Sequence, residues 1–195
     1  GLFEILAEHN IRILDQARYQ VILTTDPHSL NALRNEYRQF GRRYPVLHYT
    51  EFLARLFQEG RLRIQKPLGR RVTYHDPCYL ARYNRITEAP RRLLAAVGAE
   101  VVEMPRNREN TFCCGAGGGR IWMSEEPGRE RPSENRIREA IALGVEAFVV
   151  ACPKDYAMFT DAVKTSGNEG RIVVQDIAEL VEEAIGIPVE VVSRA

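Results

Sequence analysis

The sequence predicts an α/β fold in which helices flank parallel sheets and the chain forms two related lobes, one complete and one partial. Two observations lead to this prediction. Apolar, β-rich runs alternate with segments of helical periodicity, and the links between them are short. The order of these segments near the N-terminus is also repeated near the C-terminus. With 195 residues, 45% of them hydrophobic, the chain can form one sizeable core or two lobes that share one.

The first five elements follow from apolar spacing and from capping residues. Apolar side chains at helical spacing predict a helix over residues 2–17, and a β-rich run predicts a strand over 19–25. Residues 30–40 again have the helical pattern, and residues 45–48 are typical of a short strand. A helix over 50–60 starts with a threonine, which is a good N-cap, and ends with glycine.

The following elements belong to the larger lobe. A strand is expected over residues 71–74 and a helix over 90–97, which has proline at its start and glycine after its end. A strand over 99–104 leads into a long loop over 105–132. The closing elements are a serine-capped helix over 133–144, a strand over 145–151, a helix over 154–165, a strand over 171–174 and a helix over 176–185. Pro188 to Val192 adds either one more strand or a tail.

The repeat suggests how the chain is divided. Residues 10–60 can be laid over residues 135–186, and both blocks contain a helix, a strand, an X-Pro turn, a helix, a strand and a helix. The first block has nothing before it that matches residues 71–119. We therefore predict that residues 1–67 are the back half of a first module and that residues 68–195 are a complete second module. Since the chain begins with glycine rather than methionine, we also expect it to be a fragment of a longer protein.

Composition excludes several classes of function. The 27 basic and 26 acidic residues leave a formal charge of +1, which does not favour binding to nucleic acid or to an anionic membrane. No stretch approaches the ~20 apolar residues of a membrane span, and no signal-peptide pattern opens the chain. Four cysteines are too few for a disulfide scaffold. We expect a cytoplasmic chain, with any membrane association supplied by a partner or by the rest of the full-length protein.

The four cysteines are placed where a ligand site would form. Cys78 and Cys152 each follow a predicted strand, whereas Cys113 and Cys114 lie in the long loop. In a parallel sheet the carboxyl ends of the strands lie along one edge, where ligands gather. Three separate segments are therefore expected to meet at one pocket.

Glycines follow the adjacent cysteines and suit a bulky inorganic ligand. Gly115, Gly117 and Gly118 have no Cβ, so the backbone can approach a ligand closely and direct N–H groups at sulfur. Such donors stabilise a negatively charged cluster. The positive end of the helix after Pro153 points to the same edge of the sheet.

Other kinds of site fit less well. Any one of these cysteines could be an ordinary buried thiol, but the set with its adjacent pair and glycine run favours a metal or cluster site. Structural zinc prefers C-x2-C pairs, and the chain has none. No Lys-Ser/Thr follows Gly119, and no G-x-G-x-x-G follows the first strand, so phosphate-loop and dinucleotide sites are not indicated.

Three motifs, His75-Asp76-Pro77-Cys78-Tyr79-Leu80, Cys113-Cys114-Gly115-Ala116-Gly117-Gly118 and Ala151-Cys152-Pro153, carry a family resemblance. Together they resemble the cysteine-rich CCG domain of heterodisulfide reductases. Related iron–sulfur oxidoreductases act on glycolate, lactate or glycerol-3-phosphate, or serve the electron-transfer flavoprotein. The resemblance makes both predicted modules CCG modules, the first one degenerate. It implies a [4Fe-4S] cluster, non-cubane in some members, that exchanges electrons with ferredoxin-like clusters in other domains.

Two departures from the family pattern affect the expected ligands. The pattern has cysteine where this chain has Asp155, so the expected metal ligands are Cys78, Cys113, Cys114, Cys152 and Asp155. A carboxylate oxygen can bind iron but is a harder ligand than a thiolate, and Asp155 could equally be a non-ligand. The first module has Asp26-Pro27-His28-Ser29 where relatives have Cys-Pro-His-Cys. We expect that copy to be scaffold, with Asp26 capping a turn and His28 on the surface, rather than a weak metal site.

Further residues are expected around the pocket. His75 is the candidate catalytic residue, as a proton relay, although it could simply hydrogen-bond to the backbone. Side chains that could line the approach or hold an anionic partner are Tyr79, Arg82, Tyr83 and Arg120. Trp122 is expected to pack against the glycine loop.

These observations predict an iron–sulfur oxidoreductase fragment. Electrons would pass through the cluster between a protein donor, either a flavoprotein or ferredoxin-like clusters, and a quinone or disulfide acceptor. The partners would be other redox subunits, including a membrane-bound one. The alternative is a zinc-binding or metal-free domain that docks other subunits, for which the degenerate first module argues.

Overall fold

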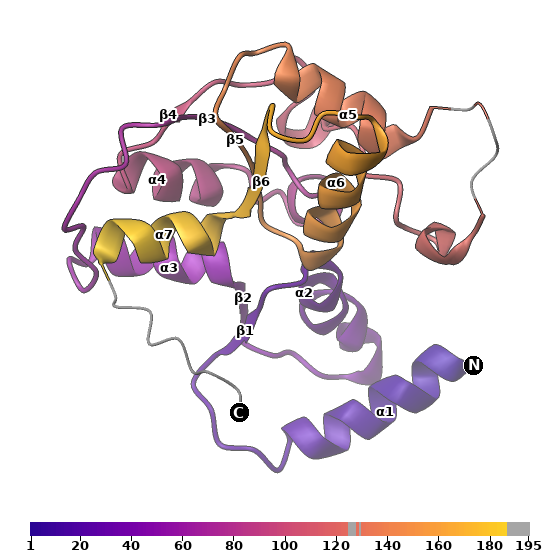
Figure 1. The fold of residues 1–195 in the computed structure, drawn as a ribbon. Helices are drawn as coiled ribbons and strands as arrows, with labels where there is room; N and C mark the ends of the chain where they lie inside the picture. The colour runs from indigo at the N-terminus through magenta and orange to yellow at the C-terminus, as the bar shows by residue number, and fades with distance from the viewer. Residues whose placement is uncertain (125–127, 129, 187–195) are drawn as a thin grey trace, which may run out of the picture.

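The computed structural model describes residues 1–124, 128 and 130–186, and it has the predicted α/β class with parallel sheets (Figure 1). From here on, the first block is residues 1–67 and the second block is the part of the chain that follows. The first block contains α1 (Leu2–Leu14), β1 (Ile22–Thr24), α2 (Pro27–Arg34), the 3-10 turn η1 (Glu36–Phe40), β2 (Val46–His48) and α3 (Tyr49–Gln58). The second starts with β3 (Arg71–Tyr74), the π-helical turn η2 (Tyr79–Tyr83), α4 (Glu88–Ala96), β4 (Glu100–Val101) and the 3-10 turns η3 (Arg108–Asn110) and η4 (Arg120–Trp122). It ends with α5 (Pro132–Ile141), β5 (Ala147–Val150), α6 (Pro153–Thr165), β6 (Val173–Asp176) and α7 (Ile177–Ile185).

The strand order creates a crevice in the larger sheet. Four parallel strands lie in the order β4-β3-β5-β6, and β1 and β2 pair in parallel as a separate two-stranded sheet. The chain runs outward from β3 to β4 and then crosses back past β3 to β5. The winding direction thus reverses between β3 and β5. Ligands of open α/β sheets bind beyond the carboxyl ends of the strands at such a reversal.

Helices cover both faces of the larger sheet (Figure 1). On β5, Ala147 and Val149 pack in one cluster with apolar residues of α3, α4 and α7. Phe148 and Val150 point to the other face and pack with apolar residues of α5 and α6. This alternation is the two-residue period of a strand, and burial on both faces explains why the sequence of β5 is a continuous apolar run.

The two blocks share core packing. Tyr49 and Ala54 of α3, in the first block, belong to the main cluster on the sheet. A smaller cluster joins Leu30 and Val46 of the first block to Leu80 of η2. The first block therefore packs directly against the segment that follows β3, and this contact brings residues of both blocks to the same edge.

The element order of the two blocks also agrees. The order β1-α2-β2-α3 recurs as β5-α6-β6-α7. Asp26 and Cys152 occupy the same place in this order, because each is the N-cap of a helix that has proline in its first turn. The division into two copies of one module, at residues 1–67 and 68–195, stays a prediction.

Some predicted boundaries are wrong. The strand expected over 99–104 is only two residues long, because Met104 turns into the core between the sheet and α5. The strand expected over 171–174 begins at Val173, because Arg171 belongs to the turn after α6 and its backbone N–H bonds to the Asn168 carbonyl. The expected element at 188–192 lies outside the described residues. Within the described ranges, no helix has the length and apolar content needed to cross a bilayer.

The start of α3 gives a pH-dependent prediction. His48, the N-cap of α3, is fully buried, and its Nδ1 lies 2.7 Å from the Thr50 hydroxyl. Burial lowers the pKa of His48 to about 4, below the value of an exposed histidine. Between about pH 6.5 and pH 4 the unfolded chain therefore binds a proton at His48 and the folded chain does not. Because of this difference, the free energy of unfolding decreases as the pH falls through this interval. Over this interval, we expect the free energy of unfolding to decrease by about 2–3 kcal/mol less in His48→Gln than in the unmodified chain.

This prediction is checked by urea denaturation at pH 7 and pH 4.5. His9→Gln, on the exposed side of α1, is the matched control and should keep the acid sensitivity of the unmodified chain. Equal pH dependence in His48→Gln and the unmodified chain would contradict the assignment of this sensitivity to His48.

Candidate functional site

The four cysteines meet in the crevice between β3 and β5. Cys78 lies at the start of η2, Cys152 is the N-cap of α6, and Cys113 and Cys114 come from the loop after β4. All four are free thiols. They line one cavity of about 50 Å³, whose other lining residues are Pro27, His28, Pro77, Tyr79, Ala116, Gly117, Lys154 and Asp155. The predicted convergence of three cysteine-bearing segments is therefore seen in the structure.

Hydrogen bonds from Arg82 and to Asp76 hold the cysteine loop against the strand ends. Arg82 of η2 donates hydrogen bonds to the carbonyls of Glu109 and Thr111, just before Cys113. Asp76, two residues after β3, accepts a 2.7 Å hydrogen bond from the backbone N–H of Arg108. These contacts tie the loop to the segment that carries Cys78, so the thiols of both segments face the same cavity.

The thiol of Cys113 is the centre of the group. The thiols of Cys114 and Cys78 lie within hydrogen-bonding reach of its sulfur, and the backbone N–H of Gly115 donates to it at 3.4 Å. These bonds lower the pKa of Cys113 well below its usual range. The same contacts, with burial, raise the pKa of Cys78 and Cys114, and burial raises that of Cys152. A thiolate is the form of cysteine that binds metal, so these contacts favour Cys113 as a ligand.

The glycines do not all have the same role. Gly115 and Gly118 have φ of +88° and +65°, in the left-handed region, whereas Gly117 does not. The N–H of Gly115 that points at the Cys113 sulfur confirms the expected backbone donor at this one position. A Cβ on Gly115 would lie 3.1 Å from both Cβ and Cγ of Pro132. A Cβ on Gly117 would meet nothing within 4 Å.

Gly115→Ala is therefore expected to distort the cysteine loop. The left-handed backbone costs an L-residue about 1–2 kcal/mol, and the contact with Pro132 adds to this cost. We expect a loss of that size in unfolding free energy, measured by urea denaturation. Gly117→Ala, two residues away, is the matched control and should change it by less than about 0.5 kcal/mol. An equal decrease in unfolding free energy in both variants would contradict a special need for glycine at position 115.

Asp155 adds an oxygen donor to the thiols. It is buried in the first turn of α6, and Cys114 lies within hydrogen-bonding reach of its carboxyl group. Burial raises the pKa of Asp155 to about 7. Its Oδ2 has no hydrogen-bond partner among the described residues. A buried carboxylate oxygen without a partner is costly unless a ligand satisfies it, so this atom fits a metal-binding role.

His75 lies beside Asp155 and does not line the cavity in the described part of the chain. Its Nδ1 accepts a 3.2 Å hydrogen bond from Nε of the buried Arg136, which leaves Nε2 to carry the proton. Nε2 lies 3.5 Å from Oδ2 of Asp155 and has no hydrogen-bond partner within the described ranges. Burial first, and then the Arg136 charge, lower the pKa of His75 well below that of an exposed histidine. His75 is therefore a neutral side chain whose Nε2 lies close to Asp155.

The first block contributes residues that sequence reasoning treated as scaffold. Asp26 does cap α2, as predicted, by accepting hydrogen bonds from the N–H groups of His28 and Ser29. His28, however, lines the cysteine cavity. Lys154, which the sequence did not single out, also lines it and lies 3.4 Å from both carboxylate oxygens of Asp26. The repeat makes Asp26 and Cys152 equivalent positions, but it does not predict that they meet in space.

Of the aromatic residues expected around the pocket, one lines the cavity and two are exposed. Tyr79 lines the cavity and lies between the rings of His28 and Tyr83, at centroid distances of 4.2 and 4.4 Å. Tyr83 is exposed at the end of this stack. The expectation that Trp122 packs against the glycine loop is wrong, because 88% of Trp122 is exposed.

Comparison with known proteins matches this site to a family. Residues 72–160 match the CCG cysteine-rich domain, and this range includes all four cysteines and Asp155. The chain is 41% identical, over 94% of its length, to a probable iron-sulfur-binding oxidoreductase FadF of Bacillus subtilis. It is 38% identical, over 94%, to an EtfAB:quinone oxidoreductase of Syntrophomonas wolfei. It is 34% identical, over 93%, to a dihydromethanophenazine:CoB–CoM heterodisulfide reductase component of Methanosarcina barkeri.

These relatives are much longer than the chain. It spans 26%, 27% and 45% of their respective lengths. The alignments cover more than nine-tenths of the chain, so the similarity also includes most of the first block, which the family match does not.

Proposed function

The chain contains a cysteine-rich domain of the CCG family, and from this we propose that it holds an iron–sulfur cluster and serves as an electron-transfer part of an oxidoreductase. One observation supports this above the others. Four free thiols from three separate segments line a single cavity at the strand-order reversal. Thiolates are the usual protein ligands of iron–sulfur clusters, and four of them suffice for a [4Fe-4S] cluster.

The proposed ligands are Cys78, Cys113, Cys114 and Cys152, with Asp155 as an additional oxygen ligand. The unpartnered Oδ2 of Asp155 supports its inclusion. Five donors exceed the four that a cubane cluster requires, so the set is also compatible with a non-cubane [4Fe-4S] form. When bound, the cluster would supply one-electron redox chemistry.

Several groups would tune the cluster rather than hold it. The N–H of Gly115 already points at the Cys113 sulfur, and such donors raise a cluster's potential. Gly117 and Gly118 would allow close approach of the backbone. The positive end of α6 favours negative charge beside Cys152. His75 would hold Asp155 in position and provide a proton near it.

The names of the relatives support a proposal for the electron partners. One relative is named for EtfAB and quinone, and another for a heterodisulfide. We therefore infer a flavoprotein or ferredoxin-like donor and a quinone or disulfide acceptor. Other redox subunits or domains, including a membrane-bound one, would bring these partners to the Cys78–Cys152 edge.

The test is anaerobic reconstitution with iron and sulfide, followed by assays of both elements and EPR spectroscopy. About four irons and four sulfides per chain and a redox-active EPR signal are expected. Asp155→Ala should change the signal, because it removes a proposed ligand of one iron. Asp161→Asn, further along the same helix and paired with Arg131 at the surface, is the matched control and should leave it unchanged.

Absence of inorganic sulfide, or zinc as the bound metal, would overturn the proposal. Either result would favour the alternative function, a zinc-binding or metal-free domain that docks other subunits. An unchanged signal in Asp155→Ala would remove Asp155 from the ligand set and leave the four thiols as the proposed ligands.

A further inference from the structure

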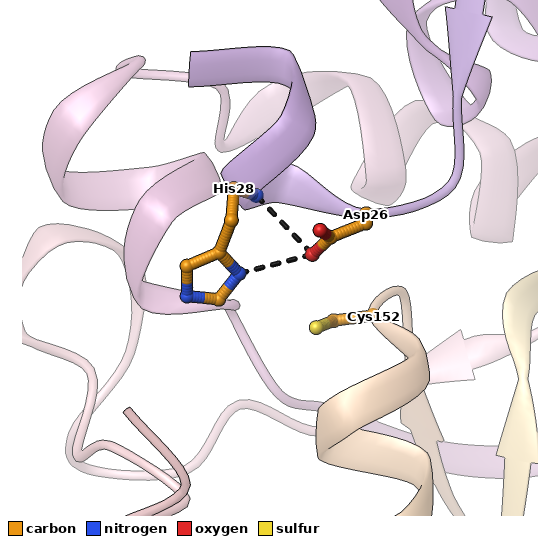
Figure 2. A group of neighbouring side chains, drawn as sticks. All are labelled: Asp26, His28 and Cys152. Atoms are coloured by element: carbon orange, nitrogen blue, oxygen red, sulfur yellow. Dashed lines mark hydrogen bonds and ion pairs between the residues drawn. The ribbon is translucent and has the colours of Figure 1, made fainter. Parts of the chain in front are cut away.

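Three metal-binding side chains from the two blocks meet beside the cysteine cavity. Asp26 and His28 come from the start of α2, and Cys152 comes from the start of α6 (Figure 2). A carboxylate oxygen, a ring nitrogen and the sulfur lie within 4.8 Å of one another. Bond lengths to zinc of about 2.0–2.3 Å place tetrahedral donors roughly 3.5 Å apart. The three donors thus need only small side-chain movements to surround one ion.

Local contacts hold two of the donors in place. Asp26 accepts hydrogen bonds from the backbone N–H of His28 at 3.2 Å and from the hydroxyl of Ser29 at 3.0 Å, and its Oδ1 lies 2.9 Å from Nδ1 of His28. Figure 2 shows the two contacts between Asp26 and His28 and the Cys152 sulfur facing the same gap. The His28 ring also packs on Tyr79 at a centroid distance of 4.2 Å. Less side-chain freedom is therefore left to be lost when a ligand binds.

The site is electrostatically suited to a cation. The ammonium of Lys154 lies 3.4 Å from both Asp26 oxygens and 3.4 Å from Nδ1 of His28. A cation thus already lies beside two of the three donors, on a long side chain that is 41% exposed.

We propose that Asp26, His28 and Cys152 form a second metal site, which binds one divalent ion of the zinc class. The mixed oxygen, nitrogen and sulfur donors suit zinc, iron(II) and cobalt(II) rather than magnesium or calcium. Three protein ligands leave a fourth position open for a water or a small ligand. Binding displaces the ammonium of Lys154, which swings out to solvent.

The site shares Cys152 with the proposed cluster cavity. In this respect alone it rests on the proposed function, and a thiolate sulfur that bridged two metals would connect the second ion directly to the cluster. The first block would then be part of the metal chemistry rather than scaffold alone. The triad itself does not require the cluster, and this allows the two ideas to be tested separately.

The probe is cobalt(II), whose bond to a thiolate produces a charge-transfer absorption band. It is added under anaerobic conditions to the iron-free Cys78→Ser/Cys113→Ser/Cys114→Ser variant, in which Cys152 is the only thiol. One cobalt per chain with a thiolate band is expected. Asp26→Asn and His28→Ala should each weaken binding by about 10–100-fold or more.

Two controls separate a metal site from an ordinary helix cap. Ser29→Ala removes the hydrogen bond that the Ser29 hydroxyl donates to Asp26 but leaves all three proposed metal ligands in place. It should therefore change cobalt affinity far less than Asp26→Asn does. Lys154→Met should tighten binding about fivefold to tenfold, because it removes the competing charge. If Asp26 and His28 only cap the helix and do not bind metal, Lys154→Met should not increase cobalt affinity.

Absence of the band, or a band that Asp26→Asn and His28→Ala leave unchanged, would overturn the proposal. If the triple variant does not fold by circular dichroism, the reconstituted four-cysteine protein is loaded with zinc instead. His28→Ala should then lose zinc while keeping its iron and sulfide, and equal zinc in both proteins would contradict the site. Failure of the cluster proposal appears separately, as missing inorganic sulfide.

Discussion

Replacing Cys113 with serine is expected to reduce the iron and sulfide bound after anaerobic reconstitution by about tenfold or more. Cys113 is the thiol whose pKa the surrounding hydrogen bonds lower, so it is ready to bind iron as a thiolate. Its sulfur also contacts Cys78 and Cys114, and it therefore lies between the other donors. A serine hydroxyl is a poor thiolate substitute because it stays protonated near neutral pH.

Iron and sulfide assays with EPR spectroscopy of the reduced protein check this prediction. Thr111→Ser, in the same loop, is the matched control, because it keeps a hydroxyl and leaves the backbone carbonyl that Arg82 binds. The control should bind as much iron as the unmodified chain. Full cluster content in Cys113→Ser would contradict a central role for this thiol.

Arg91→Leu is expected to lower the free energy of unfolding by about 3–5 kcal/mol. The guanidinium of Arg91 donates two 2.8 Å hydrogen bonds to the carboxylate of Asp76, and two more, of 2.6 and 2.9 Å, to Glu103. The Asp76 side chain is 1% exposed. Loss of the guanidinium would leave the Asp76 carboxylate buried without a counter-charge, and that desolvation cost is the reason for the large effect.

The measurement is urea denaturation of the metal-free protein under reducing conditions. Arg92→Leu, the next residue of α4, has an exposed side chain and is the matched control, with an expected change within about 0.5 kcal/mol. Asp76 also holds the N–H of Arg108 in the loop before the adjacent cysteines. Arg91→Leu should therefore also reduce cluster loading, and equal stability of the two variants would contradict this account.

The meeting of the four cysteines could be predicted from the sequence because it depends on a general property of parallel sheets. Cys78 and Cys152 follow apolar strands, and the carboxyl ends of such strands share one edge. The presence of strands β3, β5 and β6 could also be predicted, since periodicity is a local property of the chain. The predictions that were wrong, such as the length of β4 and the packing of Trp122, concern positions where tertiary contacts override local pattern.

By itself, the sequence determined the fold class, the order of the elements and the edge at which the cysteines gather. Only the tertiary structure decided which side chains join them there. Asp26 and His28 reach Cys152 because Leu30 and Val46 pack on Leu80, a contact between segments far apart in the chain. Such contacts depend on side-chain shape and on the mutual orientation of two sheets, and neither leaves a periodic signal in the sequence.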